Sequence, residues 1–205
     1  MMNEHFPKSE WGPGPWQDEP DHLAWTDERT SLACAIRRNM AIGSLCGYVG
    51  VPPTHPFFGW NYDDDIALAP GDLDKTMDDV GPIALFCYVV QGGPDHGTIP
   101  LGMTLKAHQG VNFSGTIEAD GLWWFGFDCG HAGDMMPATD ALFSRIMPPD
   151  YMREHARIFA DCKYRDLDYV RREVTALAFQ LRQLEMRVLL DHGMLKFTAN
   201  RERDA

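Results

Sequence analysis

The side chains best suited to chemistry lie in two short segments about twenty residues apart. The first is His108-Gln109-Gly110, and the second runs from 128 to 134 with the sequence Asp-Cys-Gly-His-Ala-Gly-Asp. A β-hairpin formed by 111–117 and 122–128 would bring them together, because paired antiparallel strands place their outer ends side by side. The side chains that would converge are His108, Cys129, His131 and Asp134. Two imidazoles, a thiolate and a carboxylate are ligands that Zn²⁺ takes in proteins, so this pattern predicts a zinc site.

The same four residues allow two other interpretations. In a metal-free site, Cys129 would be the nucleophile and His108 its general base. In a purely structural arrangement, Cys129 would be a buried thiol, and His131 and Asp134 would hydrogen-bond the turn that follows the strand. The residues predicted to be catalytic are His108, Cys129 and Asp134, and zinc is the predicted cofactor.

A second group of residues predicts a ligand-binding surface. His55 lies between prolines in a rigid loop, and Tyr48 could supply a hydroxyl group nearby. Trp123 and Trp124 are adjacent, so within a strand they face opposite sides, and one of them could stack on a planar ligand such as a base. The alternative is an aromatic loop that covers the edge of the sheet. The acidic run 63–65 lacks the spacing of an EF-hand and is expected to be a solvated turn.

These side chains need a sheet to position them, and the sequence predicts a mostly antiparallel one. The predicted strands are 32–36, 43–51, 83–90, 101–106, 111–116 and 122–128. The run 83–90 is apolar throughout, as is typical of a strand buried on both faces. An Asp-Gly turn at 120–121 predicts a hairpin between the last two strands.

A long amphipathic helix is predicted near the C-terminus. Its apolar residues recur at alternating spacings of three and four: Leu167, Val170, Val174, Leu177, Leu181, Leu184 and Val188. Asp166 can cap its start and Gly193 can end it. Packing on the sheet would bury this stripe, whereas pairing with the same stripe of a second copy would give a homodimer.

The length and composition indicate one globular domain of 205 residues with an α+β fold. Segment 1–30 is expected to be an irregular, aromatic arm, because Gly12-Pro13-Gly14-Pro15 excludes regular structure there. Residues 31–147 are the predicted β-rich core, and 148–205 the C-terminal helical segment. The expected fold is a mostly antiparallel sheet with an irregular N-terminal arm and one long C-terminal helix.

The charge is strongly negative and uneven. The chain has 18 basic and 30 acidic residues, a net charge of −12, and residues 1–144 alone hold 20 acidic and 6 basic residues, a net of −14. This balance argues against direct binding to nucleic-acid backbones or anionic membranes, and it would suit a basic partner protein. No apolar run has the 18 residues of a membrane span, and the first residues lack the pattern of a secretion signal. The five cysteines lack paired spacing and are expected to be reduced thiols in the cytoplasm.

Four blocks together resemble a group of uncharacterised small proteins encoded by bacteriophages and prophages. The blocks are Cys46-Gly47-Tyr48-Val49 with His55-Pro56, His108-Gln109-Gly110 with Phe113-Ser114-Gly115, Trp123 to Asp134, and Tyr164 to Val170. The middle block of that group usually reads His-Gly-Gly, and Gln109 departs from it. The resemblance implies a compact single domain in a phage-infected host cell, and it implies no particular activity.

Three functional hypotheses follow. The first is a metal-assisted hydrolase of a nucleotide or other small molecule, in which zinc lowers the pKa of bound water to about 7 and Asp134 or His55 moves the proton. The second is a non-catalytic acidic binder that inhibits a host defence protein or sequesters a signalling molecule, with the aromatic N-terminal arm as its contact. The third is a virion or assembly component that works through the C-terminal helix.

Overall fold

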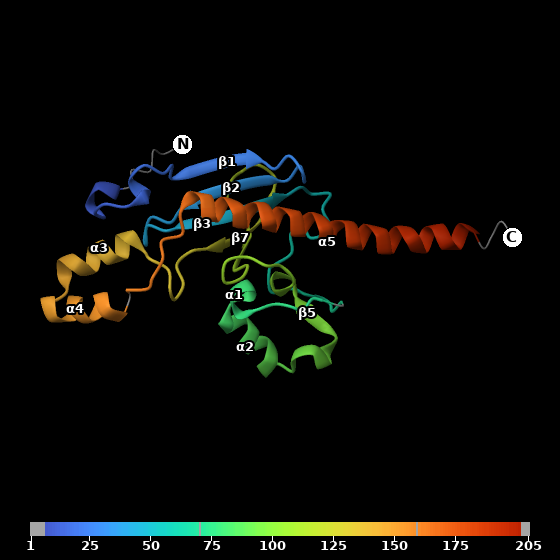
Figure 1. Ribbon diagram of the computed structural model, residues 1–205. Helices are drawn as coiled ribbons and strands as arrows, with labels where there is room; N and C mark the ends of the chain where they lie inside the picture. Colours follow the sequence, from blue (N-terminus) through green and yellow to red (C-terminus); the bar gives the residue numbers. More distant parts are fainter. Residues whose placement is uncertain (1–6, 70, 159, 202–205) are drawn as a thin grey trace.

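The protein is built on one five-stranded antiparallel sheet (Figure 1). The computed structural model describes residues 7–69, 71–158 and 160–201. The strands of the main sheet are β1 (His22–Thr26), β2 (Ala33–Arg38), β3 (Leu45–Val51), β7 (Trp123–Asp128) and β6 (Phe113–Gly115), in that spatial order. Every neighbouring pair is antiparallel, so the predicted α+β fold with a mostly antiparallel sheet is confirmed.

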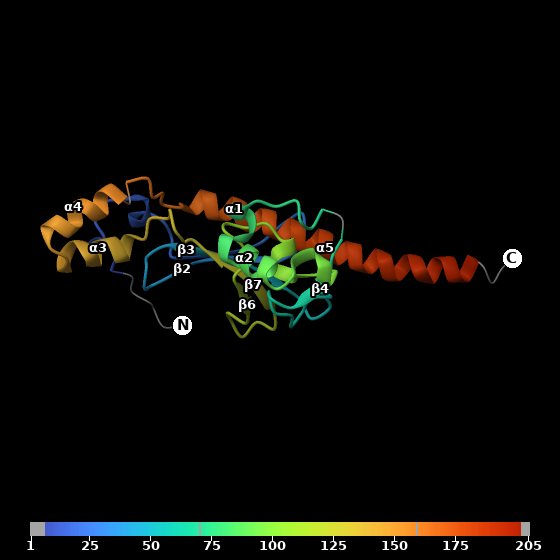
Figure 2. The ribbon, with the colours of Figure 1, turned by 90° about the horizontal axis from the view of Figure 1, so that it is seen from below.

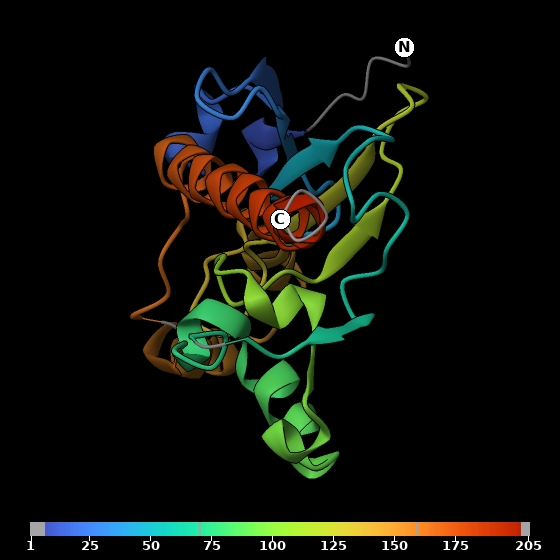
Figure 3. The same cartoon turned by 90° about the vertical axis from the view of Figure 1, so that its right-hand side faces the viewer.

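The long C-terminal helix α5 (Leu167–Arg201) packs across this sheet (Figures 1 and 3). Val170, Val174, Leu177 and Leu181 of its apolar stripe are fully buried, and each such side chain contributes about 1.5–3 kcal/mol. Gly47 of β3 permits the close approach, since a Cβ there would lie 2.5 Å from Val174 Cγ2. The chain's own sheet therefore covers the stripe as far as Leu184.

The helix continues past its predicted end. Gly193 lies inside α5, although glycine is a common helix terminator. The C-terminal part of α5 extends beyond the sheet in both views (Figures 1 and 2). None of the helices in the described ranges combines the length and the apolar character needed to cross a bilayer.

The N-terminal arm is more regular than predicted. After two short 3₁₀ turns, Lys8–Glu10 and Pro15–Gln17, residues 22–26 form β1, which pairs with β2 along its whole length. Trp11 and Trp16 are buried against Ala141 rather than presented to solvent. The arm thus packs on its own domain, and backbone pairing with β2 makes a strand of its second half.

The apolar run predicted as the strand 83–90 is instead the helix α2 (Pro82–Val90). It follows the short helix α1 (Met77–Val80), whose first turn is closed by a capping box between Thr76 and Asp79. Gly81 in a left-handed conformation and Pro82 at the first helical position then begin α2. A continuous apolar run does not distinguish a helix from a buried strand, and these two residues decide the outcome.

The remaining elements frame the sheet. The predicted strand 101–106 is a 3₁₀ helix, Leu101–Thr104, preceded by β5 (Thr98–Pro100), which pairs with β4 (Asp65–Ala67). Helices α3 (Pro137–Ile146) and α4 (Pro149–Ile158) lie at the end of the molecule opposite the C-terminus (Figure 2). The run of C-terminal helices α3, α4 and α5 therefore begins at Pro137, ten residues before the predicted boundary at 147.

Candidate metal centre

The β6–β7 hairpin brings the two chemistry-bearing segments together, as its sequence predicted. Phe113 pairs with Gly126, and the amide of Asn112 donates to the Gly126 carbonyl at 3.0 Å. The loop before β6 then runs beside the loop after β7, where the Gln109 side-chain amide donates to the Ala132 carbonyl at 3.2 Å.

Two glycines press the first loop against the junction of α1 and α2. A Cβ on Gly110 would lie 2.5 Å from the Val80 carbonyl oxygen, and a Cβ on Gly81 would lie 2.4 Å from the Gln109 carbonyl oxygen. Both glycines have positive φ, 100° and 79°, so any other residue would be strained as well as crowded. The amides of Ala107 and Gln109 also donate to the carbonyls of Asp79 and Asp78, at 3.2 and 2.9 Å. The α1–α2 pair and the His108 loop therefore form one continuous backbone contact.

Three side chains form a compact group with the composition of a metal site: His108, His131 and Asp134. One ligand atom from each lies within 4.8 Å of the others. The closest pair is His108 Nε2 and Asp134 Oδ2 at 2.7 Å, and His131 Nδ1 lies 3.9 Å from the same oxygen. The two imidazole rings meet edge to face with centroids 5.8 Å apart.

Asp134 is the buried anion of this group. Its Oδ1 accepts a hydrogen bond from Arg165 Nε at 2.9 Å, and its Oδ2 accepts from the backbone amide of His131 at 3.1 Å. Burial alone would raise the pKa of this carboxyl, but the hydrogen bonds from His108 and Arg165 outweigh it and lower the pKa. The group is therefore a carboxylate at neutral pH, the state that binds a metal ion.

His108 is oriented from its other side by the first turn of α5. His108 Nδ1 lies 2.9 Å from the Tyr169 hydroxyl oxygen, and Nε2 lies 2.7 Å from Asp134 Oδ2, so both ring nitrogens have a hydrogen-bond partner. Burial, followed by the charge of Glu173, raises the pKa of Tyr169 to about 12, so its hydroxyl stays protonated. A metal-bound histidine usually donates its second ring N–H to an acceptor, and the Tyr169 hydroxyl oxygen is placed to accept from His108 Nδ1.

Arg165 and Tyr169 were missed by the sequence analysis as site residues. Arg165 lies two residues before α5 and Tyr169 in its first turn, and the Arg165 guanidinium also lies over the Tyr169 ring at 4.8 Å. Their signal was present in the block Tyr164 to Val170, which the resemblance singled out without a role.

His131 is the member of the group that has an unsatisfied ring nitrogen. Its Nδ1 is buried and has no hydrogen-bond partner within the part of the chain that the structure describes. The nearest acceptor is Asp128 Oδ1 at 3.6 Å, and Asp128 is itself held by Asn112 Nδ2 at 2.7 Å. A buried, unsatisfied polar atom needs an explanation, and a ligand shared with Asp134 would supply one.

The spacing of the three ligand atoms suits a small divalent ion after slight adjustment. In a tetrahedral site with ligands about 2.0–2.1 Å from zinc, neighbouring ligand atoms lie about 3.3 Å apart. Here they range from 2.7 Å up to 4.8 Å. An ion bound to His108 Nε2 and Asp134 Oδ2 would leave the imidazole proton on Nδ1, from which it would donate to the Tyr169 hydroxyl oxygen, and would draw His131 inward. Three protein ligands would leave a fourth position for water.

A cleft of about 430 Å³ opens beside this group. Its polar end is formed by His131, Gln109 and Asn112, and its apolar end by the start of α2 with Val111 and Tyr62. His108 and Asp134 are buried behind His131, whose side chain is 26% exposed. A small molecule in the cleft would therefore meet His131 first.

Comparisons with protein-family models, with curated proteins and with solved structures found no match to this chain.

The structure places Cys129 apart from the three-ligand group. Phe125, Phe127 and Cys129 alternate along β7 and its extension, and all three belong to the core packed against α5. Burial, followed by the charge of Asp134, raises the pKa of the Cys129 thiol. A protonated thiol enclosed in the core is a poor nucleophile, and the compact ligand group contains His108, His131 and Asp134 without Cys129, so this geometry favours the structural interpretation of Cys129.

The predicted ligand-binding residues also lie away from the group. Tyr48 packs edge-on against Phe113, with ring centroids 5.5 Å apart, and burial raises the pKa of its hydroxyl. Trp124 is buried and donates to Asp120 at 3.2 Å, whereas Trp123 is half-buried and donates to the Trp60 carbonyl at 2.7 Å.

His55 belongs to a different part of the molecule. It is buried against α5, with Nε2 4.0 Å from Glu185 Oε2, and burial lowers the pKa of its imidazole. His108 contacts α5 at Tyr169, sixteen residues earlier, which is about 24 Å along the helix at 1.5 Å per residue. The two histidine clusters therefore do not meet, and His55 cannot move a proton at the metal group.

Proposed function

We propose that this protein is a metal-dependent hydrolase that acts on a small molecule bound in the cleft beside His131. The observation that carries the proposal is the convergence of His108, His131 and Asp134 within 4.8 Å at the wall of that cleft. Zinc suits two imidazoles and a carboxylate, and when bound it would lower the pKa of its water to about 7.

The surroundings of two carboxylates suit them to different roles, one as a metal ligand and the other as a proton acceptor. Asp134 is buried and shared by His108 and Arg165, which suits a ligand. Asp128 is partly exposed, and its Oδ1 lies 3.6 Å from His131 Nδ1, which suits an acceptor for a proton from water. Tyr169 holds His108 in place and transfers no proton in this scheme.

The lining of the cleft favours an uncharged or cationic substrate over a polyanionic nucleotide. Pro82, Ile83 and Val111 offer apolar contacts. The body of the chain is acidic, with a net charge of −14 over residues 1–144, which would repel phosphate groups. Esters and amides with an apolar group are therefore the first substrates to test.

The proposed setting is the cytoplasm of a phage-infected cell. The resemblance of the four sequence blocks supports the phage setting. The lack of paired spacing among the five cysteines supports a reducing compartment.

The deciding experiment measures metal content in protein purified without a histidine tag. Wild-type protein, incubated with Zn²⁺ and desalted, is expected to retain about one ion per chain, and His131→Ala is expected to lose it while keeping its circular dichroism spectrum. His22→Ala is the matched control, because His22 is exposed, pairs with Glu118 and is not a member of the group. A wild-type protein that retains no zinc, cobalt or manganese would overturn the proposal. Hydrolysis of ester and amide panels is then compared in the same three proteins.

A further inference from the structure

Helix α2 exposes a continuous apolar stripe. Ile83, Phe86 and Val90 follow the i, i+3, i+7 spacing of one helix face, and their exposed fractions are 78%, 67% and 68%. Cys87 and Val89 flank them and are exposed as well. We call these five residues the α2 face. The opposite side of the helix packs inward through Tyr88 and Leu85 on Val80, Ile99 and Met103.

Exposed apolar residues are ordinary when scattered, but a contiguous stripe of large ones marks an interaction site. The polar alternation expected of a solvent-facing helix is missing here, since the sequence of α2 is Pro-Ile-Ala-Leu-Phe-Cys-Tyr-Val-Val. The α2 face is thus an apolar surface that its own chain leaves uncovered.

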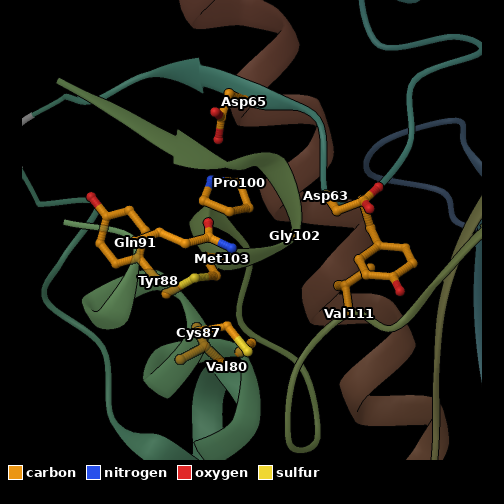
Figure 4. A pocket seen from close by; sticks show the side chains of 12 residues that line it. Asp63, Asp65, Val80, Cys87, Tyr88, Gln91, Pro100, Gly102, Met103 and Val111 are labelled. Atoms are coloured by element: carbon orange, nitrogen blue, oxygen red, sulfur yellow. The ribbon is translucent and has the colours of Figure 1, made fainter. Parts of the chain in front are cut away.

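The surroundings of this face are strongly acidic. Residues 61–100 contain eight aspartates and one basic residue, Lys75, a net charge of −7. Asp63 and Asp65 border a pocket of about 310 Å³ whose helix side is formed by Cys87 and Gln91 (Figure 4). Neither aspartate forms an ion pair with any described basic side chain. Two carboxylates that lack an ion-pair partner among the described residues therefore lie beside the stripe.

We propose that the α2 face binds a basic amphipathic helix of another protein. The apolar side of such a helix would cover Ile83, Phe86 and Val90, and its lysines or arginines would reach Asp63 and Asp65 in the neighbouring pocket. The i, i+3, i+7 spacing of the α2 face forms a stripe along which the apolar side of a second helix can pack. The negative charge of the surrounding aspartates favours a partner with basic side chains.

The charge also argues against other occupants. A second copy of the chain would bring the same carboxylates face to face, which is repulsive. Nucleic acids and anionic membranes are repelled for the same reason. The aromatic arm is the predicted contact in the binding-protein hypothesis. Its Trp11 and Trp16 are instead buried against Ala141 of the same chain.

A designed peptide tests this directly. The probe is a fluorescent 18-residue helix of leucine and lysine with the apolar positions at i, i+3, i+4 and i+7. One control peptide has the same composition in scrambled order, and another has glutamate in place of lysine. Fluorescence anisotropy is expected to show saturable binding of the amphipathic basic peptide alone, weakened by salt because the contact is partly ionic.

Three protein variants locate the binding site. Phe86→Ser is expected to weaken binding about tenfold or more, as is typical for an aromatic anchor. The double variant Asp63→Asn, Asp65→Asn is expected to weaken it and to reduce its salt dependence. Ile146→Ser is the matched control, because Ile146 is 59% exposed on α3, outside the α2 face. All of these positions are exposed, so the fold should persist in each variant.

Alkylation of Cys87 gives an independent readout on unmodified protein. Bound peptide is expected to slow the reaction of Cys87 with iodoacetamide and to leave Cys162, which lies on the chain before α5, unchanged. The proposal is overturned if the basic helix does not bind, if the scrambled peptide binds equally, or if Phe86→Ser binds as well as wild type. Self-association that Phe86→Ser abolishes would assign the face to a second copy and overturn it too. Zinc content is expected to be unchanged in Phe86→Ser, so failure here leaves the hydrolase proposal standing.

Discussion

At the residue scale, Asp134 is the side chain on which the candidate site depends. It accepts hydrogen bonds from a histidine, an arginine and a backbone amide, and its side chain is fully buried. Its backbone also forms a parallel bridge with Lys163 on the segment that leads into α5: the Lys163 amide donates to the Gly133 carbonyl, and the Met135 amide donates to the Lys163 carbonyl. Asp134 therefore links the loop after β7 to the start of the long helix.

Replacing Asp134 by Asn is expected to destabilise the fold by about 3 kcal/mol at pH 7, because it leaves a half-buried arginine without its anion. The pH dependence follows from the lowered pKa of Asp134. A carboxyl whose folded-state pKa lies below its unfolded value of about 3.9 contributes stability above that pH and loses it as pH falls through the folded-state pKa. Urea unfolding should show that the difference in unfolding free energy between wild type and Asp134→Asn becomes smaller below about pH 4. A gap that stays constant down to pH 2 would contradict this assignment.

Tyr169→Phe is expected to weaken zinc binding about tenfold while leaving the fold intact, since it removes the partner that orients His108. Competition with a chromophoric chelator measures the change. Tyr88→Phe is the control, because it removes a comparable hydroxyl bond, to the Thr98 carbonyl at 3.0 Å, away from the group. Equal zinc affinity in wild type and Tyr169→Phe would show that Tyr169 is only structural.

The sequence predicted part of this site and not the rest for identifiable reasons. His108, His131 and Asp134 were brought together by one local inference, the hairpin of β6 and β7. Cys129 continues the alternation of Phe125 and Phe127, and that period of two was the available sign that its thiol faces the core. Tyr169 lies in the first turn of α5 and Arg165 just before it, and no local pattern reveals where a distant helix docks.

At the element scale, the apolar pattern of the sequence predicts the structure of α5 correctly and that of α2 wrongly. The stripe of α5 is buried as its spacing predicts, because an amphipathic helix beside an apolar sheet has one way to cover both surfaces. The apolar run 83–90 predicts a buried strand, yet the run is helical and most of its residues are exposed. The strand prediction assumed that every apolar side chain is covered by its own chain.

Leu181→Ala is expected to cost about 2–5 kcal/mol in the free energy of unfolding, because Leu181 is fully buried between α5 and the sheet. Leu189→Ala on the same helix is the matched control and should change stability by less than about 0.5 kcal/mol, since Leu189 is 52% exposed. Chemical denaturation of both variants checks this. If the helix worked mainly by pairing with another molecule, both variants would keep wild-type stability.

At the scale of the whole molecule, one arginine joins the N-terminal arm to the rest of the chain. Arg38 is buried and reaches Asp21 Oδ1 at 2.7 Å, Glu19 Oε2 at 3.0 Å and the Tyr164 hydroxyl at 2.7 Å. Glu19 also accepts from the backbone amide of Leu167, at the start of α5. The arm, the sheet and the long helix thus share a single polar cluster.

Arg38→Ala is expected to lower stability by about 3–5 kcal/mol, because the carboxylates of Glu19 and Asp21 lose their buried counter-ion. Hydrogen exchange should rise first in residues 8–21, where the arm depends on this contact. Arg157→Ala removes an exposed pair with Glu154 and should cost no more than about 1 kcal/mol. Unchanged exchange in the arm of Arg38→Ala would show that Trp11 and Trp16 alone hold it.

Gly81 lies against the backbone of Gln109, and Gly110 lies against the backbone of Val80. This close backbone contact joins the helix that carries the α2 face to the loop that carries His108. Any ligand that displaces α1 and α2 must move the carbonyls of Asp78 and Asp79, and with them the loop that carries His108. Affinities at the two ends are then thermodynamically linked. If a helix bound on the α2 face alters zinc affinity by some factor, zinc must alter the affinity for that helix by the same factor.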